Sequence, residues 1–334
     1  MPLETVLGAV LLVAIVIYAL TGGADFGGGV WDLFASGPRA RAQRDALADA
    51  IAPIWEANHV WMILVVVLVF AAFPPAFAAI MTALNIPMTL VLIGIVLRGS
   101  AFVFRKYAAR TVAVHRGWSV VFGASSVLTP FLLGVCLGAL GSGEIRVTEA
   151  GLASGFYEGW TRPFAIGCGV FAQGLFAFLA ATYMTAETAA DAELSGDFRI
   201  RALLSGLALA PIALVVFLLA RVGAPVLFTA TARPWAPLLL GATSLCAVSA
   251  LLALWKRRYA AARLAAAAQV ALILTGWGLA QYPYLVVPDV TFANSASPAV
   301  TLRLITIALA AGVIVLVPSF VWLFRVFKGR AARA

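Results

Sequence analysis

The stretch VLGAVLLVAIVIYAL, residues 6–20, decides the fold of this chain. Similar unbroken apolar runs occur at residues 61–72 and 203–220. A membrane-spanning helix needs about 20 mostly apolar residues, whereas the strands of a membrane barrel alternate apolar and polar residues over about ten positions. Because these runs do not alternate, the sequence predicts an all-α polytopic membrane protein.

The composition of the whole chain supports the same fold class. Of the 334 residues, 63% are hydrophobic and 11% are charged, and the mean hydropathy is +1.02. A soluble domain is about 45–50% apolar and about 25% charged, so this chain could not cover itself with a polar surface. Composition therefore excludes a soluble enzyme, a disordered chain and a disulfide scaffold.

The apolar runs predict about nine spans in one integral membrane domain, residues 1–334. Their expected ranges are 4–23, 50–72, 76–97, 117–140, 163–185, 202–221, 235–254, 265–285 and 302–324. The third span is the least defined, because Pro74-Pro75 and Asn85-Ile86-Pro87 interrupt it; a re-entrant third span would leave eight. The first run has no positively charged start and continues into Gly22-Gly23, so we expect a retained span rather than a cleaved signal peptide.

The distribution of positive charge predicts the orientation, since Lys and Arg favour cytoplasmic loops. With the N-terminus outside and the C-terminus cytoplasmic, most of the 23 Lys and Arg residues, Arg98 among them, fall in inner loops and the tail. The outer side then keeps Arg146, Arg162, Arg221, Arg233 and Arg303. The net charge of +9 is thus a topology signal. Without a basic groove or an aromatic platform, it indicates no nucleic-acid partner.

Two acidic residues fall within or beside predicted spans, where an ionisable group is costly and marks a candidate functional site. Asp25 lies in TGGADFGGG, residues 21–29, at the inner end of the first span. Glu56 lies in IAPIWEANHVW, residues 51–61, in the inner third of the second span. We interpret Asp25 either as part of a close-packing motif or as a carboxylate at the mouth of a proton path from the cytoplasm.

The neighbours of Glu56 strengthen its candidacy. On a helix, Glu56 and His59 share one face, and Trp55 and His59 share the adjoining one. Asn58 adds an amide, and four such groups cannot all face lipid, so we expect them to face the bundle interior, a partner or water. A carboxylate there suits reversible proton carriage, and a purely structural hydrogen-bonding role for Glu56 is the alternative.

Histidine and cysteine are scarce. Of the two histidines, His59 lies in a predicted span and His115 in a basic inner loop. Haem iron is commonly held by His, Met, Cys or Tyr, so the chain is poorly equipped to hold several haems. Cys136, Cys168 and Cys246 are isolated within spans and are expected to be small buried hydrophobes. No metal site is predicted.

A third motif, GWGLAQYPY at residues 276–284, lies near the outer end of the eighth predicted span, where an aromatic belt is expected. Together with GADFGGG at 23–29 and IAPIWEANHVW at 51–61, it resembles the second subunit of the cytochrome bd-type quinol oxidases, with the motifs in the family's order. Departures around Ala57 and His59 resemble the cyanide-insensitive branch of that family.

The resemblance implies a fold and a partner. The fold is two four-helix bundles plus a peripheral helix. The partner is subunit I, which in this family carries two haems b and one haem d, oxidises quinol and reduces oxygen to water. This chain would be the non-haem second subunit in a bacterial inner (plasma) membrane, in contact with lipid and quinone. The complex would have room for a small accessory subunit.

The resemblance also implies roles for individual residues. Asp25 matches the family's aspartate after the first span. Trp55 and Glu56 match a Trp–acid pair that is associated with a proton path toward the haem site, and Glu56 stands where the family usually has aspartate. The residues expected to contact quinone or to lie near haem are Trp55, Asn58, His59 and Trp61. Two alternatives stay open from sequence: a proton-coupled secondary transporter, and a scaffold subunit with no proton role.

Overall fold

A computed structural model describes the backbone of residues 2–52, 55–107 and 112–328. The side chains at 106–116, which include His115, and at 323–324 and 327–328 lie outside the described part. The described elements are α1 (Leu3–Leu33), α2 (Ala40–Ile51), α3 (Trp55–Ala72), α4 (Pro74–Ala83), α5 (Asn85–Tyr107), α6 (Val112–Ser142), β1 (Val147–Thr148), β2 (Gly151–Leu152), α7 (Pro163–Glu187), α8 (Ala192–Gly223), α9 (Pro225–Ala230), α10 (Ala236–Trp255), α11 (Tyr259–Gln281), β3 (Tyr284–Val286), β4 (Val290–Thr291) and α12 (Ala299–Lys328).

Within these ranges, nine helices are long and apolar enough to cross a membrane. They are α1, α3, α5, α6, α7, α8, α10, α11 and α12. The predicted number of spans is therefore confirmed. The alternative of eight spans with a re-entrant third one is wrong, because α5 provides a complete third span over residues 85–105.

The third span lies later in the chain than the predicted range 76–97. Pro74 and Pro75 occupy the first turn of α4, where a missing backbone N–H costs no helical hydrogen bond. The ten-residue α4 is too short to cross a membrane, and the chain begins a new helix at Asn85. The Pro-Pro pair therefore starts a short helix, and the membrane span follows it.

The first helix is longer than predicted, since α1 continues through the glycine-rich segment to Leu33. Glycine lets helices approach closely in a membrane, and α1 uses it in that way. A Cβ atom on Gly27 would overlap the backbone carbonyl of Phe176 in α7, and one on Gly29 would overlap the Ser126 hydroxyl in α6. Asp25 consequently lies inside a continuous helix.

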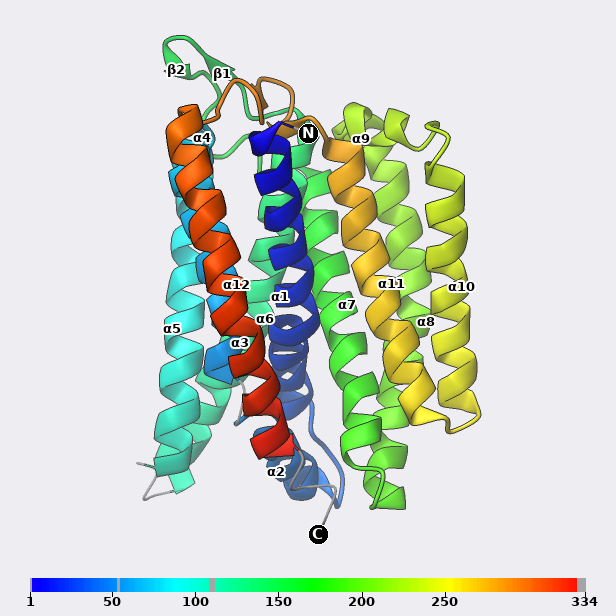
Figure 1. Ribbon diagram of the computed structural model, residues 1–334. Helices are drawn as coiled ribbons and strands as arrows, with labels where there is room; N and C mark the ends of the chain where they lie inside the picture. The colour runs from blue at the N-terminus through cyan, green and yellow to red at the C-terminus, as the bar shows by residue number, and fades with distance from the viewer. Residues whose placement is uncertain (1, 53–54, 108–111, 329–334) are drawn as a thin grey trace.

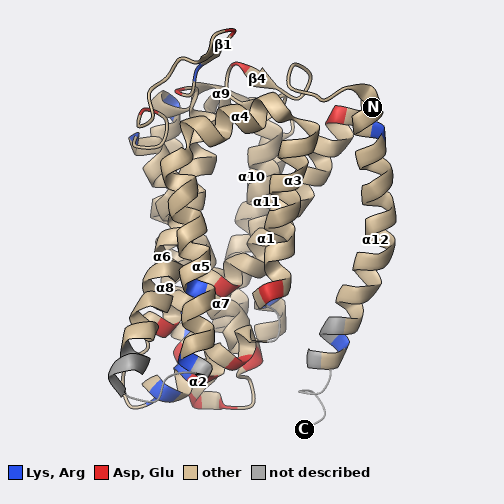
Figure 2. Ribbon diagram, turned by 90° about the vertical axis from the view of Figure 1, so that its left-hand side faces the viewer, with Lys and Arg blue, Asp and Glu red and all other residues tan. Residues whose placement is uncertain are grey.

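The spans in the described ranges form two groups of four helices plus one outer helix, as expected. Figure 1 shows how these helices are arranged. One group contains α1, α3, α5 and α6, and the other contains α7, α8, α10 and α11. The described span of α12, residues 299–322, has no buried residue in its apolar window, and Figure 2 shows α12 at the side of the molecule.

The two groups meet backbone to backbone along α6 and α7. A Cβ atom on Gly134 would lie 2.7 Å from the carbonyl oxygen of Cys168. One on Gly169 would lie 2.7 Å from the carbonyl oxygen of Phe131. We name this contact the glycine seam. It leaves no room for side chains between the two helices at these positions.

The two ends of the bundle differ in character, and α1 begins at one of them whereas α12 ends at the other (Figure 1). The hairpin end contains the start of α1 and two antiparallel hairpins, β1–β2 and β3–β4. The opposite end, where Lys and Arg gather near α2 (Figure 2), is named the basic end. Its residues include Arg39, Arg41, Arg44, Arg105, Arg199, Arg201, Lys256, Arg257, Arg258 and Arg263.

Candidate functional site

The centre of the candidate site is the carboxylate of Asp25, which is only 3% exposed. Its Oδ2 accepts a hydrogen bond from Nδ2 of Asn58, in the first turn of α3. Asn58 is itself 1% exposed. The structure therefore brings together one residue from each of the first two motifs that sequence analysis singled out.

Arg98 of α5 completes this cluster. Its Nη2 donates to the backbone oxygen of Asp25 at 2.8 Å, and its Nε donates to Oγ of Ser126 at 3.1 Å. The guanidinium carbon lies 4.9 Å from the ring centroid of Phe26 and 5.0 Å from that of Phe122. Hydrogen bonds to oxygen and contact with aromatic faces compensate a cation that has left water.

The expectation that Arg98 lies in an inner loop is wrong, because the side chain is 2% exposed and belongs to a membrane span. The error follows from the third span, which was placed too early and ended just before this residue. With α5 starting at Asn85, position 98 is well inside the helix.

A second charged pair lies next to the first on the same two helices. Arg105 donates from Nη1 and Nη2 to the two carboxylate oxygens of Asp32, at 2.8 and 3.0 Å. Asp32 is seven residues after Asp25, and Arg105 is seven residues after Arg98, so each pair of like residues shares a helix face about two turns apart. This double spacing is the sequence signal that could have identified Arg98.

Glu56 does not join the cluster. It lies in the first turn of α3 and is exposed, whereas Asn58 two residues later is buried. In this chain taken alone, Glu56 does not face the interior of the bundle. Of the possibilities that the sequence leaves for it, the exposed position fits a partner or water.

His59 is a half-buried residue that packs against the cluster. Its Nδ1 lies 3.0 Å from the backbone oxygen of Trp55, and its ring centroid lies 6.1 Å from those of Tyr18 and Phe26. Within the residues that the structure describes, no group of three or more His, Cys, Asp or Glu side chains could hold a metal ion. His59 thus has the contacts of an interior packing residue.

The two tryptophans of the second motif pack in different directions. The ring of Trp55 contacts Phe102 of α5, with centroids 5.9 Å apart. Trp61 stacks on Phe320 of α12 at 5.7 Å, with 23° between the ring planes. Trp61 therefore attaches the outer helix α12 to α3.

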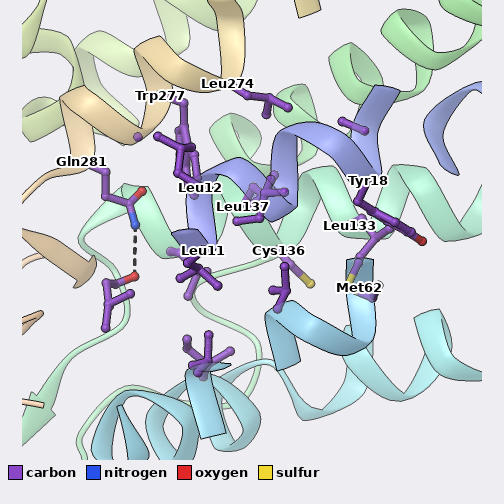
Figure 3. A pocket seen from close by; sticks show the side chains of 18 of the residues that line it. Leu11, Leu12, Tyr18, Met62, Leu133, Cys136, Leu137, Leu274, Trp277 and Gln281 are labelled. Carbon is purple, nitrogen blue, oxygen red and sulfur yellow. Dashed lines mark hydrogen bonds between the residues drawn. The ribbon is translucent and has the colours of Figure 1, made fainter. Parts of the chain in front are cut away.

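An apolar cavity of about 600 Å³ lies toward the hairpin end, with Tyr284 and Phe292 in its lining. Figure 3 shows other side chains that line it. Its walls include Leu11, Leu12 and Tyr18 of α1, Met62 of α3, Leu133, Cys136 and Leu137 of α6, and Leu274, Trp277 and Gln281 of α11. Gln281 donates from Nε2 to the backbone oxygen of Leu285, the bond drawn in Figure 3. Trp277 and Gln281 belong to the third motif, whereas Trp55, Asn58, His59 and Trp61 do not line this cavity.

Three polar atoms in the cavity-lining residues are buried. They are the hydroxyl of Tyr18, Nε1 of Trp277 and Oε1 of Gln281. Each is without a hydrogen-bond partner in the described part of the chain. The cavity therefore combines an apolar wall with a few polar groups, as ligand pockets commonly do.

Fold and site together define a polytopic helical membrane protein with a buried Asp–Asn–Arg cluster near the basic end. Comparison with known families is specific. The profile of the cytochrome bd terminal oxidase subunit II family matches residues 3–327, and the chain belongs to this family. With nine apolar helices in the described part of the chain, it is a multi-pass protein of the inner membrane.

Relatives and solved structures agree with this assignment. The cytochrome bd ubiquinol oxidase subunit 2 of Bacillus subtilis is 37% identical over 34% of this chain, and the cytochrome bd-I ubiquinol oxidase subunit 2 of Escherichia coli K12 is 29% identical over 64%. These matches span only 32% and 55% of the two relatives. A chain of the bd oxidase from Geobacillus thermodenitrificans has the same fold, with a TM-score of 0.77, 22% identity, and coverage of 98% of this chain and 99% of that one.

Proposed function

We propose that this chain is the second, non-haem subunit of a bd-type terminal quinol oxidase. In that complex, subunit I holds two haems b and one haem d, oxidises quinol and reduces oxygen to water. Family membership supports the proposal. The chain's two histidines, His59 and His115, are too few to hold three haems, whose iron is commonly held by His, Met, Cys or Tyr.

The chain's own chemical contribution is the delivery of protons, and the buried carboxylate of Asp25 is the observation that carries this assignment. Reduction of oxygen to water consumes protons. Positive charge concentrates at the basic end, which supports a cytoplasmic position for that end. Asp25 lies on that side of the bundle, where Asn58 orients its carboxylate and Arg98 binds its backbone oxygen. Because the Asp25 carboxylate contacts Asn58, a proton on Asp25 lies beside the first turn of α3.

Glu56 is the last carrier of this chain on the path. It lies two residues before Asn58 and is exposed, as a residue that contacts subunit I in the assembled complex would be. Trp55 and His59 fix the first turn of α3, through the contact with Phe102 and the contact with the Trp55 carbonyl. Protons would pass from Asp25, beside Asn58, to Glu56 and then to the partner.

The apolar exterior supports a second role, which is to cover and stabilise subunit I. Large side chains such as Ile63, Phe70, Leu92 and Val96 are exposed on α3 and α5, where subunit I and lipid would cover them. A small accessory subunit would join the same assembly.

The apolar cavity fits the hydrocarbon tail of a quinone or a lipid. The buried polar atoms of Tyr18, Trp277 and Gln281 would lie near the polar part of that ligand.

The rival proposal, a proton-coupled transporter, requires one group of helices to rock against the other. The glycine seam opposes such motion, because the α6 and α7 backbones touch at Gly134 and Gly169. Proton-driven solute uptake by liposomes that contain this chain alone would favour the transporter.

The test is oxygen uptake driven by quinol in the purified complex. We expect Asp25→Asn to slow turnover by about 100-fold, the size typical of a lost proton-transfer group, while the haem spectrum and subunit ratio stay normal. Glu56→Gln should also slow turnover, and Glu56→Asp should be tolerated better. Glu149→Gln, at an exposed acid of the hairpin end, is the matched control. Full turnover in both Asp25→Asn and Glu56→Gln would show that the chain is a scaffold subunit with no role in proton delivery.

A further inference from the structure

A polar pocket of about 710 Å³ opens at the basic end, between α2 and α5. It is separate from the apolar cavity and has a different lining. Its wall is formed by Arg41, Arg44, Asp45, Ala48, Asp49, Phe102 and Arg105. With five charged side chains in its wall, this pocket is suited to hold water at the edge of the membrane.

The floor of the pocket leads to a buried carboxylate. Arg105 lines the pocket and also donates both hydrogen bonds to Asp32. Arg44, on the α2 side, donates from Nε to the backbone oxygen of Asp32 at 3.2 Å. The Asp32 side chain is 3% exposed and that of Arg105 is 11% exposed, so this ion pair lies where the pocket meets the packed interior.

One aromatic ring joins this ion pair to the Asp25 cluster. The ring of Phe122, in α6, lies 5.1 Å from the guanidinium carbon of Arg105 and 5.0 Å from that of Arg98. One turn further along α6, Ser126 accepts from Arg98 and donates to the Phe122 carbonyl. The two charged pairs therefore follow one another along α1 and α5, with Phe122 touching both cations.

This arrangement has polar groups on both sides of an apolar ring. Carboxylates, guanidinium groups and the Ser126 hydroxyl can hold water molecules that relay a proton, whereas a phenyl ring cannot. Phe122 is fully buried, and its ring also packs on Phe102 of the pocket wall at 6.0 Å. The ring therefore contacts the pocket wall and both cations at the point where one charged group follows the other.

We propose that the pocket is the cytoplasmic mouth of the proton path and that Phe122 is the gate between its two charged steps. This inference rests on the proposed proton delivery through Asp25 and names its route and its positioning residue. A proton leaves water in the pocket, passes Asp32, and crosses to Asp25 when the Phe122 ring turns aside. Arg105 and Arg98 keep their charge throughout, and they hold the Asp32 carboxylate and the backbone of Asp25 in place.

The first experiment blocks the pocket in the assembled oxidase. Ala48→Cys places a thiol in the pocket wall, and a membrane-impermeant sulfonate-bearing thiol reagent then fills the space. Turnover should fall several-fold while the haem spectrum is unchanged. Ala42→Cys, exposed on the same helix but outside the pocket wall, is the matched control, and the unaltered chain reports labelling of Cys136, Cys168 and Cys246. If Ala48→Cys does not react in the complex, or reacts without slowing turnover, the pocket is not the mouth.

The second experiment tests the gate. The path ends at the oxygen-reducing site of subunit I and does not cross the membrane, so the readout is proton uptake by the assembled oxidase during a single turnover. Phe122→Ala should speed this uptake several-fold, and Phe122→Leu, which keeps apolar bulk, should speed it less. Val121→Ala, at the neighbouring half-buried position, is the control for general loosening of α6. Equal uptake rates in Phe122→Ala and Val121→Ala would overturn the gate.

The Asp25→Asn variant separates the two proposals. Full turnover there removes the proton path altogether. Slow turnover there, together with normal behaviour of labelled Ala48→Cys and of Phe122→Ala, would preserve the path and refute only this route.

Discussion

The two ends of the molecule each hold an Arg–Asp pair of nearly the same geometry. At the basic end, Arg105 and Asp32 share two hydrogen bonds of 2.8 and 3.0 Å. At the hairpin end, Arg146 and Asp289 share two of 2.8 and 3.2 Å. The side chains of the first pair are 11% and 3% exposed, and those of the second are 58% and 21% exposed.

This difference in surroundings decides what each pair does. Inside the bundle, either charge left alone would lie in apolar surroundings, so the partners depend on one another. At the surface, water and salt screen both charges, and such a pair adds little stability. Hydrogen-bond geometry alone would rank the pairs as equals, whereas their burial predicts very different effects of substitution.

Removing one partner of the buried pair should have the largest effect. Arg105→Ala leaves Asp32 as an uncompensated buried carboxylate, so we expect a loss of about 3–5 kcal/mol of stability. Thermal unfolding of the purified complex, followed by circular dichroism, measures it. The control is Arg41→Ala, whose side chain is 95% exposed and which should change little. Equal loss of stability in Arg105→Ala and Arg41→Ala would contradict the predicted role of burial. Recovery of part of the lost stability when Asp32→Ala is added to Arg105→Ala would support it.

Glycine-to-alanine substitutions in α1 should also affect the two ends differently, with a smaller loss of stability than in Arg105→Ala. Gly27→Ala forces a methyl group against the backbone of α7, and overpacking of this kind costs about 1–3 kcal/mol. Gly8→Ala, toward the hairpin end, meets only the ring of Phe292, which can rotate, so its cost should be lower. Gly241→Ala, which meets nothing within 4 Å, is the control and should be neutral or slightly stabilising. The same unfolding assay ranks all three, and a larger loss for Gly8→Ala than for Gly27→Ala would contradict the predicted order.

The smallest effect is expected from acid at the exposed pair. The Arg146 guanidinium and the Val147 amide hold the pKa of Asp289 below its usual range. Because this pKa is lowered on folding, the contribution of the pair is present above the unfolded value of about 3.9 and is lost as the pH falls through the folded pKa. Asp289→Asn should therefore speed proteolysis of the 141–162 segment slightly at neutral pH. That difference should disappear in strong acid, and a difference that grows with acidity would reverse the assigned sign.

The number of spans could be predicted from the sequence because apolar length alone fixes it. The limits of α1 and α5 could not, since they depend on tertiary packing. The glycines after Gly22 look like a helix end, yet the close approach of α6 and α7 keeps that segment helical. Arg98 looks like a loop residue, yet Asp25, Ser126 and two aromatic rings make its burial possible.

The candidate site was predictable in part for a similar reason. Helical spacing shows which residues share a face, but it does not show how the helix is rotated in the bundle. Asn58 and Glu56 are two positions apart and point to different surroundings, and only Asn58 reaches Asp25. Arg98 lies on a second helix, α5, and none of the three sequence motifs includes it.

The matched spacing of the two charged pairs also limits which insertions and deletions the chain can tolerate. One residue inserted or deleted between Asp25 and Asp32 would rotate one carboxylate by about 100° relative to the other. One carboxylate would then turn away from its arginine on α5, whatever residue was added. The surface segment between β1 and β2 carries no such constraint. We therefore expect length variation among related chains to collect in such surface segments and to be absent between residues 25 and 32.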